Sequence, residues 1–96
     1  MKKTNGIIFF RNGNVEPMRE KNKKLTLTGL RYMLGIGRIK VSRLGESHTM
    51  FSADTDCVAK NEIATIIARA NGIVNDDEFI YGDTLVCRNE IIPSVL

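Results

Sequence analysis

Several features that are common in small proteins are missing from this chain of 96 residues. No apolar run approaches the roughly 20 residues of a membrane span, and residues 7–10 are too few for the apolar region of a signal peptide. We therefore expect a soluble protein in the cytoplasm. Cys57 and Cys87 are too few for a disulfide framework and lack the spacing of metal ligands, so we expect two reduced thiols.

Residues with catalytic roles are also scarce. His48 is the only histidine, so a histidine base, a metal pair or a nucleophilic triad would have to use it. Its neighbours Ser47 and Thr49 favour a surface position on a strand. Residues 76–78 are three adjacent carboxylates beside turn-forming residues, which is typical of a hydrated turn. Because no nucleophile, base and orienting group occur together, we expect no enzymatic activity, no cofactor and no metal site.

Charge is distributed unevenly along the chain. Residues 1–45 contain eleven lysines and arginines and two glutamates, a net charge of +9. Residues 46–96 contain three basic and nine acidic residues, a net charge of −6, and the two halves together give the overall +3. Such asymmetry indicates either an anionic partner for the basic half or neutralisation of one half by the other within the fold.

The hydrophobic pattern predicts one small α+β domain, because 96 residues cannot enclose a second core. Residues 7–10 and 15–18 predict a hairpin around the turn-forming pair Asn12 and Gly13, with Pro17 limiting the second strand to a short edge strand. Residues 38–42 and 48–53 predict a second hairpin, and residues 84–87 predict a last strand. Residues 79–81 form a further short apolar segment.

Two helices are predicted between these strands. Thr26 is a suitable cap for a short helix with Leu27, Leu30 and Leu34 on one face, and Gly35 suits its end. Asn61 is a suitable cap for a second helix at about 62–71, with Gly72 after it. The apolar stripe of this helix is predicted to pack on the sheet through Ile63, Ile66 and Ile67. The element order is β-β-α-β-β-α-β, with a mostly antiparallel sheet.

Five short motifs resemble an uncharacterised family of small domains encoded mainly by bacteriophages and mobile elements of Gram-positive bacteria. The motifs are Val15-Glu16-Pro17, Thr26-Leu27, the glycine-flanked strand at 37–41, Asn61-Glu62-Ile63-Ala64-Thr65 and Tyr81-Gly82-Asp83-Thr84-Leu85-Val86. These motifs are structural, and the family brings no catalytic residues with it. The resemblance implies a viral protein with an accessory role in the cytoplasm of a bacterial host.

We therefore predict a non-enzymatic phage or mobile-element protein that binds and inhibits or sequesters a host defence component, either a protein or an anionic nucleotide signal. The predicted ligand-binding residues are basic. They are Arg31, Arg38, Lys40, Arg19 and Lys23. Arg38 and Lys40 share one face of a strand, Arg31 lies on the preceding helix, and residues 19–24 form a connecting arm that could join them on one anionic ligand.

Two alternatives stay open at this stage. The same basic residues could bind nucleic acid, since lysine and arginine displace the counterions of phosphates. They could also be neutralised within the fold by Asp54, Asp56 and residues 76–78, in which case they would contribute little to recognition.

The chain closes with an apolar tail, residues 91–96. Such a tail is expected to be covered, and a second copy of the chain is the simplest cover for so small a domain. The sequence therefore predicts a homo-oligomer through this tail, and the alternative is a tail that folds back on its own sheet.

Overall fold

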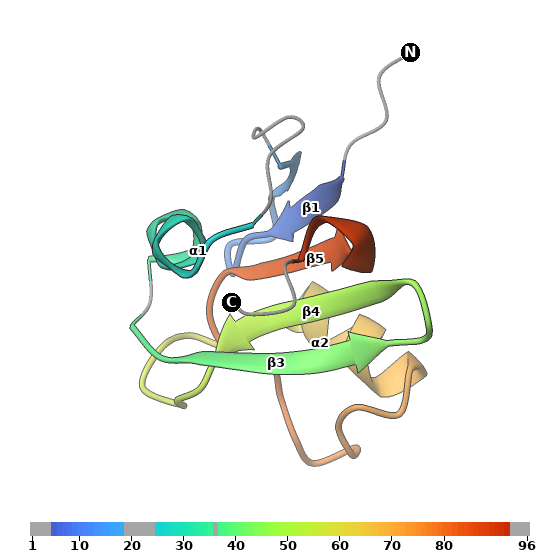
Figure 1. Cartoon of the computed structure of the whole chain (residues 1–96). Helices are drawn as coiled ribbons and strands as arrows, with labels where there is room; N and C mark the ends of the chain where they lie inside the picture. Colours follow the sequence, from blue (N-terminus) through green and yellow to red (C-terminus); the bar gives the residue numbers. More distant parts are fainter. Residues whose placement is uncertain (1–4, 19–24, 36, 93–96) are drawn as a thin grey trace.

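A computed structural model describes residues 5–18, 25–35 and 37–92 of the chain (Figure 1). The elements follow the predicted β-β-α-β-β-α-β order of an α+β domain. The strands are β1 (Gly6–Phe9), β2 (Val15–Pro17), β3 (Ile39–Leu44), β4 (His48–Ala53) and β5 (Thr84–Arg88). The helices are α1 (Leu27–Leu34), α2 (Glu62–Ala70) and the short 3-10 helix η1 (Asn89–Ile91). Neither α1 nor α2 is long and apolar enough to cross a membrane, and the described residues hold no other helix that could do so.

The described strands form one antiparallel sheet in the order β2-β1-β5-β4-β3. Two hairpins, β1-β2 and β3-β4, lie on either side of β5, which pairs with β1 and β4. The first hairpin turns at Gly13, whose φ of 96° is in the left-handed region that glycine tolerates. Pro17 lies in the edge strand β2, as predicted, where its missing N–H leaves no gap between two strands.

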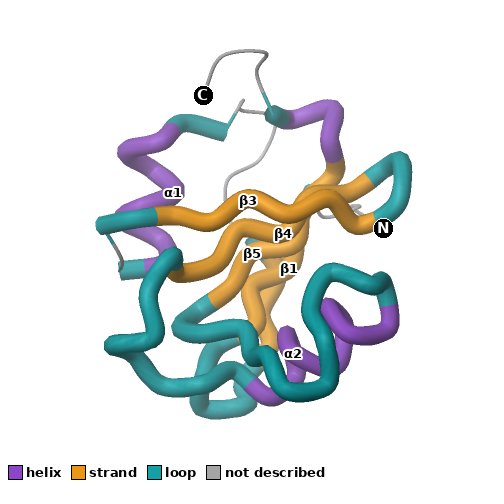
Figure 2. Tube along the Cα trace, turned by 90° about the horizontal axis from the view of Figure 1, so that it is seen from below, coloured by secondary structure: helices purple, strands orange, loops and turns teal. Residues whose placement is uncertain are grey.

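The two helices cover opposite faces of this sheet (Figures 1 and 2). Side chains alternate between the faces along each strand. In β5, Leu85 and Cys87 therefore belong to the core on the α1 side, whereas Val86 packs against the core on the α2 side. In β4, Phe51 faces α1 and Met50 faces α2 in the same way.

The side chain of Asn61 fixes the start of α2. Its Oδ1 accepts a hydrogen bond from the backbone N–H of Ala64 (3.1 Å), which confirms the predicted cap. Its Nδ2 donates to the carbonyl oxygens of Phe9 (2.7 Å) and Gly82 (2.9 Å), at the end of β1 and just before β5. One buried amide thus caps the helix and ties it to the sheet.

The rotation of α2 differs from the prediction. Ile66 is 65% exposed instead of packed on the sheet, and Ile63 is only half-buried. Ile67 packs against the α2-side core, as predicted, although it too is only half-buried. The buried side of the helix consists of small residues, namely Ala64, Thr65 and Ala68. A hydrogen bond sets this rotation, because the Oγ1 of Thr65 accepts from the backbone N–H of Ile80 at 2.9 Å.

The C-terminal segment folds back on its own sheet as far as it is described. Ile91 is buried in the α1-side core, and Ile92 packs against that core. The backbone N–H of Leu25 donates to the carbonyl of Ile91 at 2.8 Å. Ile91 and Ile92 are therefore covered by other residues of the same chain. Residues 93–96 lie outside the described residues, and the homo-oligomer through the tail stays a prediction.

Candidate functional site

The three predicted basic residues that the structure describes, Arg31, Arg38 and Lys40, do not form one site. Arg31 lies on α1, where its Nε donates to the carbonyl of Gly37 at 3.0 Å. Arg38 is exposed just before β3, and its carbonyl accepts from the N–H of Asp54 at 3.0 Å. Arg19 and Lys23 lie outside the described residues.

Lys40 lies on the face of the sheet that is opposite to α1. It pairs with Ser52, which is two residues from Met50 and therefore on the α2 side. The predicted convergence of Arg31 and Lys40 on one ligand is therefore wrong, because the sheet separates the two side chains. The strand alternation follows from the sequence, but only the tertiary structure shows which face α1 covers.

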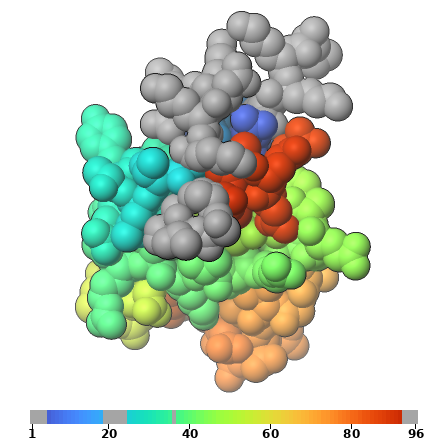
Figure 3. Space-filling view, viewed as in Figure 1, coloured from blue at the N-terminus to red at the C-terminus, as the bar shows by residue number. Residues whose placement is uncertain are grey.

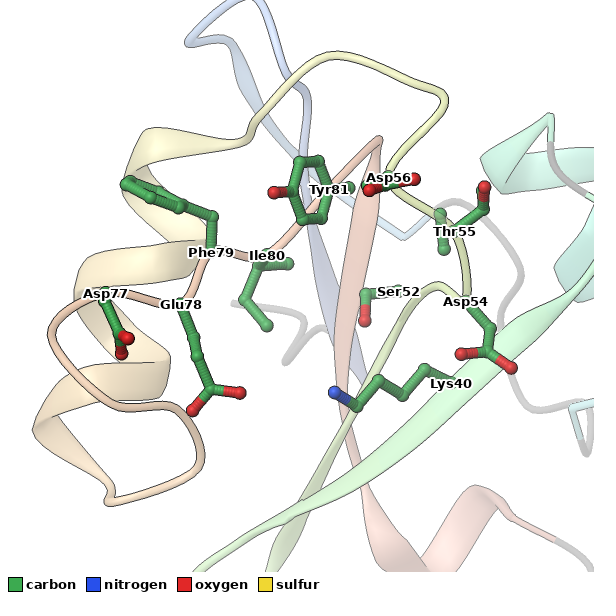
Figure 4. Close-up of a pocket in the computed structure, with 11 residues that line it drawn as sticks. Lys40, Ser52, Asp54, Thr55, Asp56, Asp77, Glu78, Phe79, Ile80 and Tyr81 are labelled. Atoms are coloured by element: carbon green, nitrogen blue, oxygen red, sulfur yellow. The ribbon is translucent and has the colours of Figure 1, made fainter.

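Lys40 instead enters a cleft of about 380 Å³, here called the acidic cleft, which is lined by Lys40, residues 52–56 and residues 77–81 (Figure 4). Four carboxylates border it, from Asp54 and Asp56 in the loop after β4 and from Asp77 and Glu78 in the turn before β5. No ion pair within 4.0 Å joins Lys40 to any described carboxylate. Lys40 is nevertheless surrounded by the residues that were expected to neutralise it within the fold, since the cleft includes Asp54, Asp56 and part of the 76–78 turn.

A second cleft, of about 460 Å³, lies over β1 and β5 on the same α2 side of the sheet. We call it the apolar cleft. It is lined by Asn5, Gly6, Ile7, Phe9, His48, Val86 and Arg88. Ile7 and Val86 are opposite each other in the register of β1 and β5, so their side chains share this face. Val15 in β2 pairs with Phe9 and continues the apolar surface to the sheet edge, where it is 49% exposed.

Helix α2 separates the two clefts. On one side of α2, Nη2 of Arg69 donates to the carbonyls of Asp76 (2.8 Å) and Glu78 (3.0 Å), which holds the acidic turn against the helix. At 100° per residue, Ile63 lies about 120° around the helix from Arg69. Ile66 lies only about 60° from Arg69, on the outward side of α2, where it is 65% exposed. The acidic turn therefore borders the β3 and β4 half of the sheet, where it lines the acidic cleft with Lys40 and Ser52.

Two cationic or polar groups border the apolar cleft. Nε of Arg88 pairs with Oε1 of Glu90 at 3.0 Å, and the Arg88 side chain is 40% exposed. Nδ1 of His48 lies 2.7 Å from Oγ of Ser47. The predicted site was based on charge alone, but the apolar residues of the first strand also indicate this cleft. Residues 7–10 are apolar at successive positions, which is typical of a strand with apolar side chains on both faces.

The two cysteines differ in burial, and neither belongs to a described group of residues that could hold a metal ion. Among the described residues, no three histidines, cysteines or carboxylates are grouped so that they could hold a metal ion. Burial raises the pKa of the Cys87 thiol to about 11, which keeps it protonated and unreactive near neutral pH. Cys57 is exposed, and its backbone N–H donates to Oγ1 of Thr55 at 3.1 Å.

No family model, curated protein sequence or solved structure matches this chain significantly. The family resemblance of the sequence motifs therefore stays a prediction.

Proposed function

We propose that this chain is a non-enzymatic binding protein that inhibits or sequesters a partner protein by occupying it through the α2 side of the sheet. The observation that carries the proposal is the apolar cleft. Its floor is formed by Ile7, which is 37% exposed, and by the half-buried Phe9 and Val86, so α2 covers this floor only in part. Open apolar surface of this kind is typical of protein contact sites and costs solubility when it serves no partner.

The side chains of the apolar cleft limit which kind of partner segment could bind there. An apolar side chain fits the floor, and the guanidinium of Arg88, whose side chain is 40% exposed, borders it. A carboxylate next to the apolar side chain could accept hydrogen bonds from that guanidinium, which offers five N–H donors. We therefore propose a partner segment with an apolar residue beside an acidic one. The family resemblance makes a host defence protein the first class of partner to test.

The nucleic-acid alternative has less support from the same face. Lys40 is bordered by four carboxylates, which repel phosphate groups. Arg31, Arg38 and Arg43 are exposed and keep this alternative testable, although Arg31 already donates to Gly37.

A matched pair of surface variants tests the proposal. Ile7→Glu places a charge on the floor of the apolar cleft, whereas Val41→Glu places the same charge on β3, where Val41 is 59% exposed and outside the cleft. Tagged parent and variants are used to capture proteins from a Gram-positive bacterial lysate, with and without nuclease, and bound proteins are measured by mass spectrometry. We expect a host protein that is retained by the parent and by Val41→Glu and lost with Ile7→Glu.

Circular dichroism checks that each variant is folded, and Val15→Glu in the edge strand replaces Ile7→Glu if the latter unfolds. The proposal is wrong if Ile7→Glu and Val15→Glu capture the same proteins as the parent. Capture that disappears with nuclease would favour the nucleic-acid alternative instead.

A further inference from the structure

The acidic cleft has the charge of a site for cations. Its four carboxylates outnumber its one ammonium group, that of Lys40. They come from two chain segments on opposite sides of the opening, the loop after β4 and the turn before β5 (Figure 4). A cation between the two segments would therefore meet carboxylates from both sides, and the electrostatic attraction is strongest for a group that leaves bulk water.

Ser52 is a second and independent feature of this cleft. The residue is only 1% exposed, yet its side chain lines the cleft and points into the space beside Lys40 (Figure 4). Its Oγ has no hydrogen-bond partner among the described residues. Every fully buried side-chain polar atom of the described residues does have a partner, so the Ser52 Oγ is not one of these fully buried atoms. The Oγ atom must therefore retain access to the cleft. A hydroxyl in this position can accept a hydrogen bond from an N–H donor.

The walls of the cleft are held by hydrogen bonds before any ligand arrives. Oε1 of Glu78 accepts from the backbone N–H of Asn75 (2.9 Å), and Arg69 holds the same turn from the side of α2. The N–H of Ala53 donates to the carbonyl of Tyr81 (3.3 Å), which joins the two walls at the base. Such preformed walls reduce the entropy lost when a ligand binds.

We propose that the acidic cleft binds one alkylammonium or guanidinium group. The carboxylates of the two walls would accept its N–H donors together with Oγ of Ser52, and the methylene groups would lie along Ile80 and the ring of Tyr81. The ligand can come from two sources with the same chemistry, a free polyamine or a lysine or arginine side chain of a protein. This site is separate from the apolar cleft and does not depend on the proposed function.

The proposal reverses the role that the sequence suggested for Lys40. Its ammonium group competes with an incoming cation for the same carboxylates, so its removal should strengthen binding. An anion site would respond in the opposite direction. Lys40→Met therefore separates the two interpretations by the sign of its effect.

The test is an NMR titration of the ¹⁵N-labelled chain with ethylguanidinium, spermidine, a blocked Gly-Arg-Gly peptide and propionate as the anionic control. We expect the three cations to shift the amide signals of residues 52–56 and 77–81, and propionate to leave them unchanged. Lys40→Met should tighten cation binding about two- to fivefold, the range for one partly exposed charge pair. Asp54→Asn should weaken it by a similar factor.

Glu46→Gln is the matched control, because it removes one exposed carboxylate from the β3-β4 turn outside the cleft. It should leave the cation affinities unchanged, as should Ile7→Glu in the apolar cleft. Ser52→Ala should weaken binding while the protein stays folded. Binding of spermidine without the peptide would identify a free polyamine, and the reverse would identify a protein side chain. The proposal is overturned if no cation shifts these signals, if propionate does so instead, or if Lys40→Met weakens binding.

Discussion

The two faces of the sheet are covered by side chains of different size. On the α1 side, the core contains large residues from both ends of the described chain. They are Ile8, Met18, Leu25, Leu30, Leu34, Phe51, Leu85, Cys87 and Ile91. Figure 3 shows this side, with α1 in cyan above the green surface of β3. On the α2 side, the helix contributes Ala64 and Ala68 to a smaller core.

This difference explains where the clefts lie. Small side chains let α2 approach the sheet closely, but they do not reach sideways to cover the neighbouring strands. Both clefts are therefore on the α2 side, one on each side of the helix. The α1 side therefore holds the larger apolar core, whereas the α2 side holds both clefts.

The largest expected contrast concerns the two cysteines. Cys87 is fully buried in the α1-side core with a pKa raised to about 11, and Cys57 is exposed in the loop after β4. Because the thiolate is the reactive form, Cys57 should react with a thiol reagent at pH 8 at least about a thousand times faster than Cys87, which has to wait for unfolding. The release of a coloured thiol product measures both rates.

Cys57→Ser serves as the control, since it leaves Cys87 as the only thiol. In denaturing urea the remaining thiol should react at once. Fast reaction of this variant in native buffer would show that the α1-side core opens readily and would remove the basis of the comparison.

The next contrast concerns one truncation on each helix. Leu30 is fully buried on α1, so Leu30→Ala should lower the free energy of unfolding by about 2 to 5 kcal/mol. Ile66→Ala on α2 removes a similar side chain from an exposed position and should cost less than about 0.5 kcal/mol. Urea unfolding monitored by circular dichroism measures both values. Equal losses would mean that α2 buries Ile66 after all.

A smaller loss of stability is expected when a larger side chain is placed between α2 and the sheet. Ala68 is fully buried between the helix and the sheet, and Ala68→Leu should lower the free energy of unfolding by about 1 to 3 kcal/mol through overpacking. The same urea experiment measures the change. Ala70→Leu is the control, because Ala70 is exposed at the end of the same helix and should tolerate the change. A stabilising effect of Ala68→Leu would indicate an unfilled space between α2 and the sheet.

Local signals in the sequence were enough to predict the secondary structure and its order. Thr26 and Asn61 cap helices through hydrogen bonds to residues three positions ahead, and Gly35 has a φ of 63° at the predicted end of α1. Pro17 predicted a short edge strand, since a proline lacks the N–H that an inner strand needs. Each of these signals acts within a few residues and does not depend on the rest of the fold.

The faces of helix and sheet that meet could not be predicted, because they depend on contacts between residues far apart in the chain. The side of α2 that contacts the sheet is set by Thr65 and Asn61, whose partners Ile80, Phe9 and Gly82 are 15 to 52 residues away in the chain. The separation of Arg31 from Lys40 depends on which face of the sheet α1 covers, and charge along the sequence carries no information on that choice. The two clefts could not be predicted either. The space left beside a helix depends on its position over the sheet and not on its own residues alone.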